Sequence, residues 1–512
     1  MDNGKKYGWG VALAAGILAG CAAEEDAAKR LNILFIMSDD HALQAVSACG
    51  GKLVETPNID RIAREGVVFD NSFVANSISG PSRACMLTGK HSHANGFRNN
   101  EDRFDGSQPT FPSILRRAGY QTAVIGKWHL GSRPEGFDHW DILVGQGDYY
   151  NPDFISDGDT IRREGYVTDL TADLAMEWLD ERDPRRPFCL LMHNKAPHRI
   201  WMPAIEDLGS SDSVTYPVPD TFEDDYAGRR AAALQEMNIA RDMDLIYDLK
   251  IDPALTEGRA WLTAAAKASV DRMSEEDRKA WDAYYSRRSE EFAQRKRLGR
   301  ELDEWKLQCY LKDYTAVIRS VDRNVGRVLD YLKANGLDRN TLVVYTSDQG
   351  FYMGEHGWFD KRFMYEESFR TPLVAYLPEG AKGRITEPVQ NIDYAPTFLE
   401  AAGVAVPEDM HGRSLMPLLR GEHPEDWRTS LYYHFYEYPG EHAVRRHEGV
   451  RNARYKLIRF YGDGEWWEFY DLGEDPRELH NAIDDPRYAE EIARARAELD
   501  RLRAEYHAPE VH

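Results

Sequence analysis

The strongest constraint on the fold is a set of short, uninterrupted apolar runs that end in polar residues. The first run, residues 31–37, leads directly into Ser38-Asp39-Asp40. Such a continuous run is typical of a central parallel strand that is covered on both faces. Helical segments alternate with the runs, which predicts an α/β fold. We expect further strands at 66–70, 121–126, 188–192, 341–346 and 371–376, and helices at 57–65, 110–118, 166–180, 310–335 and 393–402.

Acidic residues stand at the carboxyl ends of two of these strands. Asp39 and Asp40 follow the first strand, and Asp348 with Gln349 follows the strand at 341–346. Adjacent buried carboxylates repel each other, and a hard divalent cation resolves this. Three carboxylates and an amide oxygen suit calcium, with magnesium as the runner-up, better than zinc. The alternative is a helix cap beside a solvated acid.

The segment Ser79 to Gly89 follows the strand at 66–70 and reads as a helix start. Pro81 fits the first helical turn, and we expect Ser82 to be a capping side chain there. Ser79 then lies at the mouth of the helix N-terminus, where free N–H groups favour anions. Arg83 adds a fixed positive charge one turn later. An ordinary capped helix start is the alternative interpretation.

The pattern Ser79-x-Pro81-Ser82-Arg83-x-x-x-Leu87-Thr88-Gly89 resembles the signature of type I sulfatases. That resemblance implies the α/β sandwich of the alkaline-phosphatase superfamily over roughly 31–506. It also implies that Ser79 is oxidised to formylglycine, an aldehyde whose hydrate attacks sulfur and then expels sulfate. A serine in this position resembles the branch that depends on an oxygen-independent, anaerobic-type maturating enzyme.

The same resemblance assigns the remaining site residues. Gly126-Lys127-Trp128-His129 matches a family motif in which the lysine and the histidine contact the aldehyde hydrate and the sulfate. His198 approaches the ester oxygen, and Lys361 is the second lysine on the sulfate. Gln349 departs from many relatives, which have Asn or His there. The implied catalytic residues are Ser79, Arg83, Lys127, His129, His198 and Lys361, and the implied metal ligands are Asp39, Asp40, Ser79, Asp348 and Gln349.

A second set of residues could line a substrate pocket. His93 lies in a polar loop after the signature, Asp360 and Arg362 flank Lys361, and a basic loop follows near 442–447. A helix-terminal histidine and a solvated loop are the alternatives. The candidate substrate-binding residues are His93, Asp360, Arg362, His442, Arg445 and His447.

Residues 346–367 resemble bacterial enzymes that remove 6-O-sulfate from N-acetylglucosamine in host glycans. Two other functions stay open at this point: a phosphoesterase of the same superfamily, and a silent, surface-anchored glycan-binding protein in which Ser79 remains serine. The net charge of −22 argues against nucleic-acid binding. It also requires that any attraction for a sulfated glycan be local, in a basic pocket.

The N-terminal segment predicts export. Lys5 and Lys6 precede an apolar run, residues 9–18, that is too short to span a membrane, and Leu18-Ala19-Gly20-Cys21 resembles a bacterial lipobox. We expect a lipid anchor on Cys21 and a place in the periplasm or at the outer-membrane surface; a cleaved signal with an incidental cysteine is the alternative. Cys49, Cys85, Cys189 and Cys309 are expected to be buried thiols.

These patterns divide the chain into three parts. Residues 1–30 form the signal and tether, and residues 31–415 form the catalytic domain, with a helical insertion at about 205–300. Residues 416–512 form a smaller C-terminal subdomain with an antiparallel sheet. Within the insertion, 225–243 and 274–302 are expected to be helical; in the subdomain we expect strands at 431–438, 448–451, 455–461 and 468–471 and a helix at 488–506.

Overall fold

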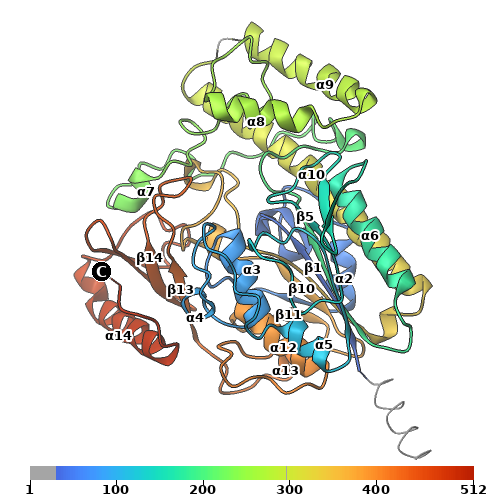
Figure 1. The fold of residues 1–512 in the computed structure, drawn as a ribbon. Coiled ribbons are helices and arrows are strands. Elements are labelled where there is room, and N and C mark those ends of the chain that lie inside the picture. Colours follow the sequence, from blue (N-terminus) through green and yellow to red (C-terminus); the bar gives the residue numbers. More distant parts are fainter. Residues whose placement is uncertain (1–29, 296, 512) are drawn as a thin grey trace, which may run out of the picture.

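The computed structural model describes residues 30–295 and 297–511, arranged around a ten-stranded sheet (Figure 1). The strand order is β11-β2-β10-β9-β1-β8-β4-β5-β6-β7, and the five contiguous strands from β9 to β5 are parallel. The mostly parallel sheet predicted from the apolar runs is confirmed. The strands are β1 Asn32–Ser38, β2 Val67–Phe69, β4 Gln121–Gly126, β5 His139–Leu143, β6 Asp153–Ser156, β7 Asp159–Arg162, β8 Phe188–Asn194, β9 Thr341–Ser347, β10 Leu373–Tyr376 and β11 Gly383–Ile385.

Helices cover both faces of this sheet because its strands are apolar on both faces. In β1, Leu34 and Ile36 join the core layer under α2, α6 and α10, whereas Ile33, Phe35 and Met37 join the layer under α3, α5 and α12 (Figure 1). These residues are almost completely buried. The helices are α2 Ile59–Glu65, α3 Ser79–Thr88, α4 Ser92–Asn95, α5 Phe111–Arg117, α6 Val167–Glu181, α10 Arg300–Ala334, α11 Glu366–Phe369, α12 Tyr394–Ala401 and α13 Met416–Leu419.

The insertion differs from the sequence prediction in two places. In the predicted helix at 225–243, the helix that forms is the short α7, Arg230–Leu234. The Asn238 side chain accepts hydrogen bonds from the N–H groups of Ala240 and Arg241, so side-chain capping competes with the helix there. The predicted helix at 274–302 forms as α9 (Glu275–Gln294), which ends eight residues early, and a separate helix, α8 (Ala260–Val270), precedes it. α10 begins at Arg300, ten residues before the predicted start, because Gly299 has a φ of 53°.

The C-terminal strands form the predicted antiparallel sheet. Its order is β13-β14-β15-β16, and one face packs against α14, Ala489–Glu505. Residues of the opposite face, among them Tyr433 and Ile458, join the core of the large sheet. The subdomain therefore forms a continuous core with the catalytic part. Its strands are β13 Ser430–Phe435, β14 His447–Asn452, β15 Tyr455–Phe460 and β16 Trp466–Asp471, and a two-stranded sheet joins β3 Ser72–Phe73 to β12 Val389–Gln390.

The cysteines in the described part of the chain form no disulfide bond. In the described part of the chain Cys49, Cys85, Cys189 and Cys309 are free thiols, and the last three are buried. Among residues 30–295 and 297–511, the helices are too short or too polar to cross a bilayer. The apolar run at 9–18 and Cys21 lie outside the described residues, so the lipid anchor stays a prediction.

Candidate active site

The site forms where the carboxyl ends of the central strands meet. Ser38, the last residue of β1, pairs with Ser347 of β9 on one side and with Asn194 of β8 on the other. This register places Asp39 and Asp40 beside Asp348 and Gln349. Because parallel strands deliver their carboxyl ends to one edge, two segments 308 residues apart build one cluster, in which the Asp40 N–H donates to Asp348 Oδ1 at 3.0 Å.

Buried oxygen atoms dominate the cluster. Asp39, Asp40, Asp348 and Gln349 have no exposed surface. The Gln349 amide nitrogen donates to Asp348 Oδ1 at 2.8 Å and to Asp40, while Asp40 Oδ2 and Gln349 Oε1 have no hydrogen-bond partner. Orphaned buried oxygens are costly unless a cation takes them up. The donor set therefore fits the hard divalent cation predicted from the sequence.

Burial and mutual repulsion shift the pKa values of the three aspartates in the cluster. Burial, with repulsion from Asp39 and Asp348, raises the pKa of Asp40 to about 7, although Lys361 pairs with it. Burial and Asp39 likewise raise the pKa of Asp348 to about 6. Burial acts in the same direction on Asp39, but the nearby Lys127, His198 and Arg83 hold the pKa of Asp39 well below its ordinary value. Asp39 therefore stays ionised, and the other two carboxyls need a further positive charge.

Ser79 is the first residue of α3, so its side chain lies at the helix N-terminus. Its Oγ donates to Asp39 Oδ1 at 3.0 Å. The expected capping role of Ser82 is wrong: its hydroxyl donates to the Asp348 carbonyl and accepts from Asn391 Nδ2 at 2.8 Å. Ser82 lies inside the first turn, where it ties α3 to the strand end instead of capping the helix. All of α3 is buried, so charges placed at Ser79 are shielded from water.

Arg83 fixes the relative positions of two strand ends. Its Nη2 lies 2.9 Å and its Nε 3.2 Å from Asp348 Oδ2, and its Nη1 donates to the Lys127 carbonyl at 2.8 Å. A planar guanidinium gives this fork geometry, which a lysine cannot reproduce. Arg83 therefore contributes positive charge at Ser79 and also holds the β4 and β9 ends together.

Lys127 and His129 reach the site from the loop that follows β4. The expected strand-like alternation is not observed, because β4 ends at Gly126 and His129 has a φ of 57°. Both side chains nevertheless meet at Gln146, whose Oε1 accepts from Lys127 and whose Nε2 lies 3.0 Å from His129 Nε2. Lys127 also pairs with Asp39. Since lysine is only a donor, this arrangement makes His129 Nε2 an acceptor and leaves its proton on Nδ1.

Gln146 was missed by the sequence analysis. It lies between Gly145 and Gly147, whose φ values are 58° and 72°, so the backbone turns sharply on both sides of it. Lys195 Nζ donates to the Gln146 carbonyl at 3.2 Å. A glutamine between two glycines is a weak sequence signal, because the glycines predict a turn but not what the glutamine side chain contacts.

His198 and Lys361 approach the carboxylates from two other segments. His198 Nε2 lies 3.8 Å from Asp40 Oδ2, and Asp39, Asp40 and His198 form a group whose ligand atoms lie within 4.8 Å of one another. His198 Nδ1 donates to the Arg199 carbonyl at 2.7 Å, so Nε2 is the ring atom that faces the site. Lys361 pairs with Asp40, and the opposing charges raise its pKa. The structure therefore brings all six predicted catalytic residues to one place.

Three of the candidate substrate-binding residues lie at the edge of this cluster. Arg362 pairs with Asp360, and the Asp360 carboxylate is 3.2 Å from His442 Nε2. Glu441, whose side chain is half exposed, binds Arg199 at 2.9 Å and lies 3.8 Å from Arg362. Arg199 and Glu441 were also missed, because nothing in the local sequence separates them from ordinary surface charges.

The contacts of the other three candidates are made outside the carboxylate cluster. His93 in α4 makes its hydrogen bond outside the cluster. Its Nε2 donates to the Tyr506 carbonyl at 2.7 Å, beyond the far end of α3. His447 is fully buried among Phe363, Tyr433 and Phe460, where its Nε2 accepts from the Met364 N–H. Arg445 stacks on Tyr438 and pairs with Asp463. Packing thus engages His93 and His447, and Arg445 has partners of its own, so a role of these three side chains in sugar binding stays a prediction.

The comparisons with known proteins identify the family. The sulfatase family model matches residues 31–404, and the model described as N-sulphoglucosamine sulphohydrolase, C-terminal, matches residues 354–505. The chain belongs to the sulfatase family. It is thus a sulfuric ester hydrolase with the alkaline-phosphatase-like fold expected from the motif.

Individual relatives cover nearly the whole chain. N-acetylglucosamine-6-O-sulfatase of Bacteroides thetaiotaomicron is 49% identical over 506 residues, which cover 96% of this chain and 90% of the relative. A solved structure described as a complex with its substrate D-glucosamine-2-N,6-O-disulfate has a TM-score of 0.91 at 48% identity, covering 94% of this chain and 99% of that one. Human N-acetylglucosamine-6-sulfatase is 27% identical over 463 residues, 83% and 71% of the two chains.

Proposed function

We propose that this sulfatase removes the 6-O-sulfate of N-acetylglucosamine in glycans, with a formylglycine made from Ser79 as its nucleophile. The observation that carries the proposal is the position of Ser79. It lies at a buried helix N-terminus, where its hydroxyl donates a hydrogen bond to Asp39. The surrounding cluster includes Arg83 and Lys127. The substrate rests on the likeness to the N-acetylglucosamine-6-O-sulfatase and to the disulfate complex.

The cationic side chains of this chain would bind the sulfate. Arg83, Lys127 and Lys361 are almost fully buried, and each is paired with a carboxylate of the cluster. In a dry site such fixed charges stabilise developing negative charge on oxygen strongly. Lys195 is close to Lys127 and donates a hydrogen bond to the Gln146 carbonyl. Burial together with repulsion from Lys127 lowers the pKa of Lys195 to about 8.

Two histidines would move protons. His129 presents an unprotonated Nε2, and burial with repulsion from Lys127 keeps its pKa well below the ordinary value, so it can accept a proton at neutral pH. His198 faces the site through Nε2 and can protonate the departing sugar oxygen only as an imidazolium. A bound sulfate would favour that charged form, because it adds negative charge nearby.

A divalent cation, calcium with magnesium as the runner-up, would supply positive charge at the nucleophile and the sulfate. Asp39, Asp40, Asp348 and Gln349 would hold it, together with the group derived from Ser79. A two-metal phosphoesterase is less well supported. In the part of the chain that the structure describes, the Asp39–Asp40–His198 group is the one set of three or more His, Cys, Asp or Glu that could hold a metal.

Mass spectrometry and a substrate panel test the proposal together. After coexpression with an anaerobic-type maturating enzyme, the peptide that carries Ser79 should be lighter by two hydrogens. The protein should then hydrolyse 6-O-sulfated N-acetylglucosamine faster than 2-O-sulfated or N-sulfated sugars. Ser79→Ala should abolish turnover, whereas Ser92→Ala, at the equivalent first position of α4, should retain it. Full turnover by protein whose Ser79 is unmodified would contradict the proposal.

The cellular location is a separate proposal. The lipobox at 18–21 supports export and anchoring through Cys21, in the periplasm or at the outer-membrane surface, where sulfated glycans are accessible.

A further inference from the structure

His198 lies in the loop that follows β8, and its ring is oriented by a hydrogen bond to the next residue. The Nδ1–H donates to the Arg199 carbonyl at 2.7 Å, which leaves Nε2 to face Asp40 Oδ2 at 3.8 Å. A histidine ring can rotate and can carry its proton on either nitrogen, so this bond selects one orientation and one tautomer. The direction of the Arg199 carbonyl therefore decides whether Nε2 faces the cluster.

The side chain of Arg199 is held by a buried carboxylate of the insertion. Its Nε and Nη2 donate to the two oxygens of Asp248 at 2.6 and 2.9 Å. Asp248 is fully buried and Arg199 is 7% exposed, so water screens this pair little. The Nη1 of Arg199 binds Glu441, whose side chain is half exposed. Because a planar two-bond pair fixes direction as well as distance, Asp248 is the stronger constraint on Arg199.

Lys250 holds the chain on the other side of the same carbonyl. Its Nζ donates to the Trp201 carbonyl at 3.1 Å and to the Asp248 carbonyl at 2.8 Å. One short loop of the insertion thus contacts residues 199 and 201, which flank the peptide group that accepts from His198. Turning the Arg199 carbonyl away from His198 requires one of these buried contacts to break, which is costly. We call Asp248 and Lys250 the insertion clamp.

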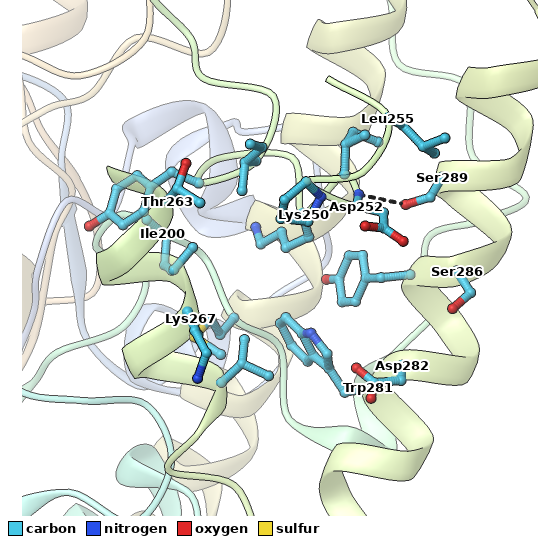
Figure 2. Close-up of a pocket in the computed structure, with 18 of the residues that line it drawn as sticks. Ile200, Lys250, Asp252, Leu255, Thr263, Lys267, Trp281, Asp282, Ser286 and Ser289 are labelled. Carbon is cyan, nitrogen blue, oxygen red and sulfur yellow. Dashed lines mark hydrogen bonds between the residues drawn. The ribbon is translucent and has the colours of Figure 1, made fainter. Parts of the chain in front are cut away.

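The loop that carries the insertion clamp is itself anchored to α9 and α10. The Asp252 N–H donates to Ser289 Oγ of α9 at 3.0 Å, as the dashed line in Figure 2 shows. Asp313 of α10 accepts from Lys250 at 2.9 Å and pairs with Arg288 of α9 at 2.7 Å. The helices of the insertion are therefore connected to the loop after β8 by a continuous set of polar contacts.

We propose that Asp248 and Lys250 position His198 as the proton donor to the departing sugar oxygen. The proton leaves Nε2 as the bond between sulfur and the sugar oxygen breaks, and Nδ1 keeps its proton on the Arg199 carbonyl. Asp248 and Lys250 act through Arg199 and Trp201, so both are positioning residues. This inference rests on the proposed function, in which His198 is the proton donor. It gives the helical insertion a part in catalysis.

A double-mutant cycle on the matured enzyme tests the inference. Asp248→Asn keeps the size of the side chain but removes its charge and one acceptor. We expect it to lower kcat for 6-O-sulfated N-acetylglucosamine by about 10- to 10²-fold with little change in KM, the loss typical of a misplaced catalytic group. His198→Ala should lower kcat by about 10²–10⁴-fold. The double variant should lose no more than His198→Ala does, because the residue that Asp248 positions is then gone.

Asp393→Asn is the matched control. Asp393 is also fully buried and binds the two Nη atoms of Arg428 at 2.6 and 3.0 Å. Its other bonds are to the N–H groups of Gln390 and Arg413 rather than to the loop after β8. We expect Asp393→Asn to lower the melting temperature without slowing turnover, which separates positioning of His198 from a general loss of stability.

Three outcomes of the cycle would overturn the inference. Losses that multiply in the double variant would show that Asp248 acts independently of His198. Unchanged turnover in Asp248→Asn would show that the insertion clamp is not needed. Full turnover in His198→Ala would remove the proton donor itself. If Asp248→Asn does not fold, Lys250→Met replaces it and is judged by the same cycle.

The tautomer of His198 gives a second test that needs no turnover. If the matured wild type hydrolyses no 6-O-sulfated N-acetylglucosamine, the proposed function fails, and nitrogen NMR of histidine-labelled protein then decides on the insertion clamp alone. The signal that disappears in His198→Ala identifies this ring. It should carry its proton on Nδ1 in the wild type and on both nitrogens, as a mixture, in Asp248→Asn. The same tautomer in both proteins would overturn the inference.

Discussion

Removal of divalent cations should destabilise this protein more at alkaline than at acidic pH. Burial and mutual repulsion raise the pKa of Asp40 to about 7 and that of Asp348 to about 6, from an ordinary value of 3.8. The folded state thus binds these protons more tightly than the unfolded state does. Without a cation, the free energy of unfolding therefore falls as the pH rises from about 4 to about 7, and changes little above that.

The size of the effect follows from the shift. One pKa unit corresponds to about 1.4 kcal/mol, so the roughly three-unit shift of Asp40 corresponds to about 4 kcal/mol lost by pH 8. A bound cation offsets this loss because it stabilises the ionised carboxylates, and it binds weakly at pH 5 because it must displace protons. Calcium should therefore raise the melting temperature by several degrees at pH 8 and by much less at pH 5.

Thermal melting in calcium or in chelator, between pH 5 and pH 8, measures this difference. Asp40→Asn should shrink the calcium effect at pH 8, because it removes one ionising ligand. Asp322→Asn is the control: Asp322 in α10 is also buried with a raised pKa, but it binds Asn58, away from the cluster. A calcium effect that is equal at all pH values, or largest at pH 5, would refute the reasoning.

Three further predictions follow from individual residues. Gln146→Glu should move the acidic limb of the pH–kcat/KM profile upward by about 1–3 units, because a carboxylate beside His129 favours its imidazolium; an unmoved profile would show that Gln146 does not act on His129. His198→Ala should slow hydrolysis of a 6-O-sulfated sugar by about 10²–10⁴-fold but that of a nitrophenyl sulfate much less, and equal losses in the two assays would exclude proton donation. Cys21→Ala should release the protein from membranes on fractionation, and unchanged membrane association would contradict the lipid anchor.

Much of the fold and the centre of the site could be predicted because their signals are local. An apolar run followed by Asp39-Asp40 or by Asp348-Gln349 carries both the strand and its ligands, and parallel strands bring such ends together. The prediction was wrong where composition is ambiguous. Charged segments with helix formers, as at 225–243, look alike whether they become helices or irregular loops held by side-chain caps.

The sequence by itself determined the α/β architecture, the carboxylate cluster and the position of Ser79 at a helix start, because each depends on neighbouring residues and on strand direction. Only the tertiary structure decided which further side chains contact that cluster or lie at its edge. It brought in Gln146, Arg199 and Glu441 from loops without a motif, and it placed His93 and His447 in packed aromatic surroundings. The reason is physical: whether a loop side chain faces a cleft or a core depends on contacts between segments hundreds of residues apart, which no local pattern encodes.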